Sequence, residues 1–358
     1  MMLTLAKLEH KLRPMLSSLL PPKFFMEMYS SKRQDFIKAL ANAVNKPVNN
    51  AHHEVNVCGV NFRNDLGNAA GLDKDGSLLE FNYCIGAGFA VVGTVLNKPH
   101  TGNIVKIRGK EYNPWVPLPN THSALNSLGL PSLGVDKSLE NIDKFRQKYP
   151  DKKFPIGLSI MGHPLQQGQE KLDGILECVE KAIGKVEFIE INESCPNVKH
   201  HSDDGLEKRL KAVTALKKET PIFVKLGSLG NAENNVRLLD NCSVDGLVLL
   251  NTQKDYDHYR PKLVGADRKV FDFYTKEFEG GLSGEIIRDL SFDSVKQAAA
   301  AIKEQNSKLQ LIHVGGINSA ADVVESRQHA PLREWYTGMM EHICSKPLNS
   351  VYKDMVNK

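Results

Sequence analysis

The strongest constraint on the fold is a regular alternation between short apolar runs and longer amphipathic segments, which continues to the C-terminus. Each apolar run is typical of a buried strand. The expected strands are Leu66–Ala70, Phe89–Val92, Phe154–Ile160, Val186–Ile191, Ile222–Lys225, Gly246–Leu250, Leu309–Val314 and Leu332–Tyr336. Strand–helix repetition of this kind requires a parallel sheet with right-handed crossovers. About eight repeats predict an α/β fold closed as a TIM (β/α)8 barrel.

The segments between these strands have the length and apolar spacing of helices. The expected helices are Gly76–Ile85, Leu139–Tyr149, Leu165–Ile183, Leu206–Thr220, Ala232–Asn241, Ser294–Gln305 and Ala320–Gln328. Before the first repeat, Val55, Val57 and Phe62 alternate with polar residues, which predicts a hairpin.

Residues 1–46 follow a different pattern and are predicted to form a small helical extension to a barrel of residues 47–358. Leucines recur there at helical spacing, lysine and arginine are in excess, and Pro21-Pro22 divides the segment in two. Two short basic amphipathic helices can lie on a membrane surface or cap an apolar channel. They can equally be ordinary helices packed on the domain, with their lysines in solvent.

The composition excludes several classes of protein. The chain has 358 residues, 41% of them hydrophobic and 25% charged, which is ordinary for a globular protein. Its six cysteines form no CxxC pair, so no metal site or disulfide framework is expected and a reducing, intracellular compartment is indicated. The net charge of +4 does not indicate nucleic-acid binding. No apolar run has the length of a membrane span, and no secretory signal is recognisable.

Polar and small residues follow several strands, at the points where a parallel barrel carries its functional groups. Small residues and Lys74 follow the first strand, and Asn192, Cys195 and Asn197 follow the fourth. Lys225 ends the fifth strand, where a lysine costs energy unless it meets an anion. Gly315-Gly316 precede a helix and could expose backbone N–H groups to a phosphate. The alternatives are a polar turn with a buried cysteine, a salt-bridged structural lysine and a simple glycine turn.

Four motifs together resemble the dihydroorotate dehydrogenases. They are Asn-Ala-Ala-Gly-Leu-Asp-Lys-Asp-Gly (68–76), Asn-Glu-Ser-Cys-Pro-Asn (192–197), Gly-Gly-Leu-Ser-Gly (280–284) and Val-Gly-Gly-Ile (314–317). Gly93-Thr94, Val224-Lys225 and Asn251-Thr252 fall between them in the expected order. The resemblance runs from about Val55 to Val356. It implies a TIM barrel that carries FMN and oxidises dihydroorotate to orotate in pyrimidine synthesis.

The resemblance also implies roles for individual residues. The residues expected to hold FMN are Ala70, Gly71, Lys74, Thr94, Ser159, Asn192, Lys225, Leu250, Ser283, Gly284, Gly315, Gly316, Tyr336 and Thr337. The residues expected to bind the pyrimidine are Lys74, Asn126, Ser127, Leu128, Gly129, Leu130, Asn192, Asn197, Asn251 and Thr252. Cys195 takes the position of the base that removes a C5 proton from dihydroorotate. Lys225 takes the position of an unpartnered ammonium that stabilises negative charge in the reduced ring.

Two features point to different classes within this family. The N-terminal segment resembles the extension of the membrane-associated, quinone-linked class, whereas a cysteine base resembles the soluble class. The leading prediction is a quinone-linked enzyme that sits peripherally on the cytoplasmic side of the inner membrane through its N-terminal helices. The alternatives are a soluble cytoplasmic enzyme with an acceptor such as fumarate, and a degenerate barrel without catalysis.

Some residues depart from the family pattern. Ser159 stands where the quinone class has an asparagine, and Leu250 replaces a threonine. Leu332–Trp335 is unusually polar for a central strand. Glu193 puts a carboxylate inside the fourth motif, where we expect it to point outward rather than to act in catalysis.

Overall fold

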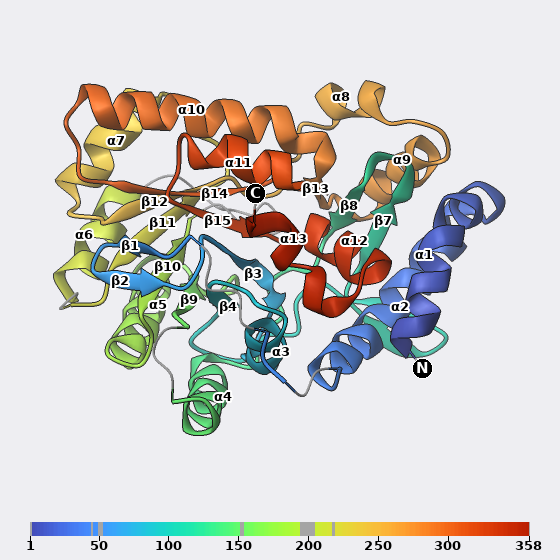
Figure 1. Ribbon diagram of the computed structural model, residues 1–358, viewed down its shortest axis with the longest axis horizontal. Coiled ribbons are helices and arrows are strands. Elements are labelled where there is room, and N and C mark those ends of the chain that lie inside the picture. Colours follow the sequence, from blue (N-terminus) through green and yellow to red (C-terminus); the bar gives the residue numbers. More distant parts are fainter. Residues whose placement is uncertain are drawn as a thin grey trace.

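A closed barrel of eight parallel strands forms the centre of the molecule (Figure 1). The computed structural model describes residues 2–43, 46–48, 53–150, 154–193, 205–216 and 219–357. Successive barrel strands along the chain are neighbours, and β15 closes the barrel against β3. The barrel strands are β3 Leu66–Asp73, β4 Ala90–Val95, β9 Ile156–Ile160, β10 Phe188–Asn192, β11 Ile222–Leu226, β12 Gly246–Leu249, β14 Gln310–Val314 and β15 Leu332–Trp335. The predicted TIM barrel is therefore confirmed.

Amphipathic helices surround the barrel and cover the outer faces of its strands (Figure 1). They are α3 Leu79–Cys84, α4 Val135–Lys148, α5 Gly168–Ala182, α6 Leu206–Leu216, α7 Ala232–Asn241, α10 Arg288–Glu304, α11 Ala320–Arg327, α12 Thr337–Ser345 and α13 Lys353–Val356. The seven helices predicted from the sequence are all present, although α10 begins six residues before its predicted start at Ser294. The N-terminus of α11 is closed by a complete capping box between Ser319 and Asp322.

Aromatic rings fill the N-terminal half of the barrel. Phe188 and Phe223 project inward from the neighbouring strands β10 and β11, and Phe89 lies directly before β4. Phe62 packs against Phe89 and Phe188. Phe62 belongs to the predicted hairpin, which comprises β1 Val55–Val57 and β2 Val60–Phe62. A Cβ on Gly157 would lie 2.3 Å from the Phe188 ring, so that glycine provides the room for it. This apolar layer closes the bottom of the barrel and leaves only its C-terminal end open.

A small antiparallel sheet stands beside the C-terminal end of the barrel. Its strands are β7 Trp115–Leu118, β8 Ser123–Asn126 and β13 Gly281–Gly284, in the order β13–β8–β7. The crossover after β12 also contains α8 Tyr256–Tyr259 and α9 Asp267–Phe278. A separate hairpin pairs β5 Val105–Ile107 with β6 Lys110–Tyr112. None of these elements was predicted from the sequence.

The N-terminal extension consists of α1 Met2–Leu19 and α2 Pro22–Ala41, which lie together at one side of the barrel (Figure 1). Helix α2 buries Phe25, Met26 and Tyr29 against the small sheet and α9. Helix α1 contacts α2 and α12 but leaves Leu8 57% and Leu19 70% exposed. Among the described residues, no helix has the length and apolarity needed to cross a membrane.

Candidate active site

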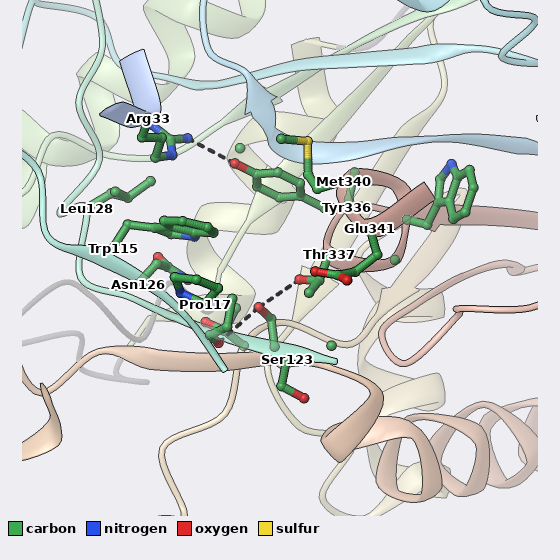
Figure 2. A pocket seen from close by; sticks show the side chains of 18 of the residues that line it. Arg33, Trp115, Pro117, Ser123, Asn126, Leu128, Tyr336, Thr337, Met340 and Glu341 are labelled. Atoms are coloured by element: carbon green, nitrogen blue, oxygen red, sulfur yellow. Dashed lines mark hydrogen bonds between the residues drawn. The ribbon is translucent and has the colours of Figure 1, made fainter. Parts of the chain in front are cut away.

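A cavity of about 560 Å3 opens above the C-terminal ends of the barrel strands. The small sheet and helices α1 and α2 contribute its outer walls. Figure 2 shows Trp115 and Leu128 on one side of it, with Tyr336 and Met340 on the other. The volume is typical of a small-molecule or cofactor site, and its position matches the end of the barrel where such sites occur.

The cavity brings together most residues that were predicted to form the site. Those lining it are Ala70, Gly71, Lys74, Thr94, Asn126, Leu128, Gly129, Leu130, Asn192, Lys225, Leu250, Asn251, Thr252, Ser283, Gly284, Gly315, Gly316, Tyr336 and Thr337. Ser127 lies outside the lining, and its hydroxyl donates to the carbonyl oxygen of Phe278 at 2.9 Å. Ser159 is fully buried behind the lining. Cys195 and Asn197 lie outside the described residues.

One end of the cavity presents the start of α12 without a side-chain cap. Tyr336 is the N-cap residue and makes no capping hydrogen bond, and the first turn contains no acidic residue. The hydroxyl groups of Thr337 (Figure 2) and Ser283 lie 3.0 Å apart beside it. Gly315 and Gly316 both adopt positive φ angles. Because an uncapped helix start carries free N–H groups and partial positive charge, this end of the cavity suits a phosphate.

The middle of the cavity is lined by a chain of hydrogen-bonded side chains at the ends of β4, β10 and β12. The amide nitrogen of Asn192 donates to the Thr94 hydroxyl at 3.0 Å. The amide nitrogen of Asn251 donates to the Asn192 amide oxygen at 3.3 Å. Asn126 reaches the same cavity from β8 and donates to the carbonyl oxygen of Gly281 at 3.3 Å. Carboxamides offer both donors and acceptors, so this wall can pair with the amide-like edges of a pyrimidine.

Lys225 is not the unpartnered ammonium that the sequence predicted. Its Nζ lies 3.4 Å from Glu190 Oε2 and 3.1 Å from Glu334 Oε2, and all three side chains are buried. Burial alone would lower the pKa of Lys225, but the two carboxylates outweigh it and raise that pKa. The prediction was wrong because it left out Glu190 on the neighbouring strand, and because Glu334 comes within reach only through closure of the barrel. The salt bridges of the alternative, a salt-bridged structural lysine, are present, and the lysine also reaches the cavity.

Charged side chains also line the outer half of the cavity. Arg13 of α1 donates to Glu9 at 2.8 Å and to Glu341 of α12 at 3.1 Å, and all three residues line the cavity. His10 and Glu341 lie 2.6 Å apart. Burial raises the pKa of Glu341, but hydrogen bonds with His10 and His122 and the charge of Arg13 outweigh burial and hold that pKa well below its usual range. These contacts tie α1 to the barrel.

Two polar residues that looked anomalous in the sequence have structural partners. Glu193 accepts hydrogen bonds from the Arg209 guanidinium at 3.1 and 2.7 Å, which supports the expectation that it points away from the chemistry. Arg333, in the unusually polar strand β15, contacts Asp65 at 2.7 Å. Its neighbour Glu334 points the opposite way, toward Lys225. The polarity of β15 therefore reflects one ion pair on each side of the barrel wall.

Sequence reasoning missed Glu190 and Glu334 as parts of the site, although a signal was present. Successive side chains in a strand alternate between its faces, so Glu190 shares a face with Asn192. Asn192 pairs in register with Lys225 across β10 and β11. A carboxylate one layer below that pair was therefore readable from the sequence. The contribution of β15 was not, because its position depends on closure of the barrel.

Comparisons with known proteins give a consistent result. Residues 52–343 match the family model described as dihydroorotate dehydrogenase. A relative named "Dihydroorotate dehydrogenase (quinone)" from Delftia acidovorans is 28% identical and aligns with 80% of this chain and 81% of its own. A relative of the same name from Acinetobacter baumannii is 29% identical over 79% of this chain and 81% of its own.

The solved structures agree at the level of the fold. A DHODH from Eimeria tenella in complex with ferulenol superposes with a TM-score of 0.76 at 22% identity, covering 91% of this chain and 89% of the other. A ligand-free DHODH from the same organism gives a TM-score of 0.74 at 22% identity, covering 91% and 94%. At this level of identity the likeness shows a common fold alone.

Proposed function

Because the chain belongs to the dihydroorotate dehydrogenase family, we propose that it oxidises dihydroorotate to orotate on FMN and passes the electrons to a quinone. The observation that carries the choice of acceptor is the extent of the cavity. It runs from the strand ends of the barrel to side chains of α1 and α2, including Leu5, Ala6 and Phe36. Leu5 is 58% exposed, so the cavity reaches the exposed leucine-rich surface of α1.

The residues at the barrel mouth fit FMN. The uncapped start of α12 and the glycine pair 315–316 suit its phosphate, as described above. A Cβ on Gly71 would meet only Tyr336 and Lys74, at 3.8 and 3.9 Å, so the backbone there is open toward the cavity. This leaves space for a flat ring against β3. Bound FMN would supply the acceptor for the hydride that leaves the substrate.

The polar wall of the cavity fits the pyrimidine. In this proposal Asn126, Asn192 and Asn251 orient the ring by hydrogen bonds, and Lys74 pairs with the substrate carboxylate. Cys195 accepts the C5 proton, and Asn197 adds a further amide, as the resemblance implies. A thiol has a free pKa of about 8.5 and is more acidic than a hydroxyl, so a cysteine base suits pH values near neutrality.

The N-terminal helices are proposed to form the acceptor side of the enzyme. Residues 1–46 would act as a unit that rests peripherally on a membrane through Leu8, Leu12 and Leu19 of α1, all of which are exposed. An amphipathic surface helix with an apolar face binds in this way without crossing the bilayer. A lipid-soluble quinone would then enter the cavity between α1 and α2, which both line it.

Narrowing the entrance between α1 and α2 tests this assignment. We expect Ala6→Trp to lower turnover with a quinone by about tenfold or more, corresponding to ~1.4 kcal/mol of lost acceptor interaction. Reduction of the bound FMN by dihydroorotate should keep its rate, because Ala6 lies on the helical side of the cavity. The measurement is steady-state turnover with a quinone and with fumarate, together with stopped-flow reduction by substrate.

The matched control is Ser18→Trp, which adds the same ring at an exposed position of α1 that lies outside the cavity lining. That variant should turn over quinone at the parent rate. Equal losses with quinone and fumarate in Ala6→Trp, or no loss with quinone, would contradict entry between the helices. Parent enzyme that uses fumarate as well as quinone would favour the soluble acceptor that Cys195 suggests.

A further inference from the structure

The cavity floor is formed by a buried charged layer that the family comparison does not assign. Glu190 of β10, Lys225 of β11 and Glu334 of β15 project into the barrel directly above the aromatic layer that contains Phe188 and Phe223. Side chains two residues apart on a strand share a face, so Glu190 follows Phe188 and Lys225 follows Phe223. Lys225 reaches the cavity lining, whereas the two carboxylates lie beneath it.

The layer contains more acidic than basic groups. Across the described part of the chain, Lys225 is the cation within ion-pair distance of Glu190 and of Glu334. Both carboxylate side chains have no exposed surface. If both were ionised, the layer would hold an uncompensated negative charge with apolar rings below it, which burial strongly disfavours. One oxygen of Glu334, Oε1, is buried and has no hydrogen-bond partner, whereas both oxygens of Glu190 have one. Glu334 is therefore the less well paired of the two carboxyl groups.

Of the two carboxyl groups, Glu334 is the one whose pKa is raised. Burial, opposed by Lys225 and reinforced by the neighbouring Glu190, raises the pKa of Glu334 to about 8. A carboxyl group with a raised pKa stays neutral below that value and becomes negative as pH rises through it. A neutral Glu334 would remove the excess negative charge from the layer.

A hydrogen-bonded path links this layer to the wall of the cavity. The hydroxyl of Ser159 donates to Glu190 Oε1 at 2.7 Å and lies 3.1 Å from the hydroxyl of Thr94. Thr94 in turn accepts a hydrogen bond from the amide of Asn192, at 3.0 Å. Ser159, which was predicted to touch the cofactor, instead connects the buried carboxylate to residues that do line the cavity.

We propose that Glu190 and Glu334 are positioning residues that hold Lys225 against the cavity floor, and that Glu334 does so as a neutral acid. This inference rests on the proposed FMN site. It means that the floor beneath the ring carries no net charge at neutral pH, in place of the positive charge of a lone lysine. Above about pH 8 the floor becomes negative, and addition of electrons to the ring is then disfavoured.

Other ionisable groups lie near Glu334, and the test must distinguish its titration from theirs. Arg333 precedes Glu334 on β15 but contacts Asp65 on the outer side of the barrel. His313 lies on the neighbouring strand β14 and contacts Ser291 on the same outer side. Lys74 lines the cavity from the end of β3. Beside it, burial raises the pKa of Asp73 to about 7, and that carboxylate accepts a hydrogen bond from the backbone of Gly76.

The test compares parent protein with Glu334→Gln, which keeps the shape of the side chain and removes its titration. Infrared difference spectra between about pH 7 and about pH 9.5 should show loss of a protonated carboxyl band in the parent, and that band should be absent in the variant. In the holoenzyme, the midpoint potential of FMN should fall more steeply above about pH 8 in the parent than in Glu334→Gln. Below that pH the two potentials should follow the same line.

Glu190→Gln provides a second, independent variant. Removing the negative charge of Glu190 lets Glu334 ionise at lower pH and pair with Lys225. The loss of the carboxyl band and the steeper fall of the FMN potential near pH 8 should therefore disappear in this variant too. Glu187→Gln is the control, because Glu187 lies just before the same strand and pairs with Arg146 outside the cavity. That variant should keep the parental titration.

Persistence of the carboxyl band and of the change in slope in Glu334→Gln would assign them to another group, such as Asp73, and overturn the proposal. The proposal would also be overturned if the parent protein showed no carboxyl titration over the pH range of the infrared measurement. Failure of the chain to take up FMN would contradict the proposed function instead, and the infrared comparison on the apoprotein would still decide the state of Glu334.

Discussion

Replacing Lys225 by methionine is expected to lower the free energy of unfolding by about 3–5 kcal/mol at pH 8, because it leaves the buried acidic side chains of Glu190 and Glu334 without their cation. The loss should shrink as pH falls toward about 5. Burial already raises the pKa of Glu334 above its usual value, and the variant lacks the Lys225 charge that opposes this rise. The folded state of the variant would therefore bind more protons than the unfolded chain and gain stability as pH falls. Urea unfolding at several pH values, with FMN in excess, measures the effect.

The triple variant that combines Lys225→Met with Glu190→Gln and Glu334→Gln separates stability from chemistry. Uncharged side chains of similar volume should recover most of the lost stability, since a buried ion pair contributes little net stability relative to well-packed neutral residues. Reduction of FMN by dihydroorotate should be slower than in the parent in both the single and the triple variant, because both lack the Lys225 ammonium. A single Lys225→Met variant as stable as the parent at every pH would contradict the contacts seen in the barrel.

Replacing Cys195 by alanine is expected to slow reduction of bound FMN by dihydroorotate by about 10²–10⁴-fold near neutral pH, the usual contribution of a general base. The variant should still bind FMN, because the side chains that line the cavity at the barrel mouth remain. Stopped-flow absorbance under anaerobic conditions measures the rate. A reduction rate close to that of the parent would exclude Cys195 as the base.

Serine at the same position provides a more informative comparison. Cys195→Ser should retain a base, but one that is less acidic, so the pH–rate profile should move to higher pH relative to the parent. Cys58→Ala serves as the control, because Cys58 is exposed, forms no disulfide and lies outside the cavity lining. Its profile should be identical to that of the parent.

The positions of most site residues were predictable because a parallel barrel gathers its functional groups at one end. Once the strands were placed, Gly71, Thr94, Asn192 and Asn251 had to lie on the same side of the molecule. Errors of one or two residues at the strand ends did not matter for this reasoning. The resemblance of the motifs then supplied the chemical roles that the barrel alone could not.

The small sheet could not be predicted in the same way. Its strands come from two distant segments, Trp115–Asn126 and Gly281–Gly284, and each strand is only four residues long. Such short strands carry little periodic signal, and their pairing is stabilised by α2 and α9 packing over them. The same sheet positions Asn126 in the cavity, so part of the substrate wall depends on contacts that are invisible locally.

Lys225 shows a different limit. Its strand and its inward direction were readable from the sequence, but its charge state depends on side chains from two other strands. Glu190 could have been placed by alternation along β10, whereas Glu334 meets Lys225 only because the barrel closes between β15 and β3. Local patterns therefore locate a charged residue without revealing whether it is neutralised.

Anaerobic mixing of the purified, FMN-loaded protein with dihydroorotate tests whether this barrel is the enzyme that its family and cavity indicate. We expect the visible flavin absorbance to bleach, with orotate formed in equal amount, and a quinone added afterwards to restore the colour. Bound FMN that stays oxidised in the presence of dihydroorotate, yet is bleached by dithionite, would contradict the proposed activity.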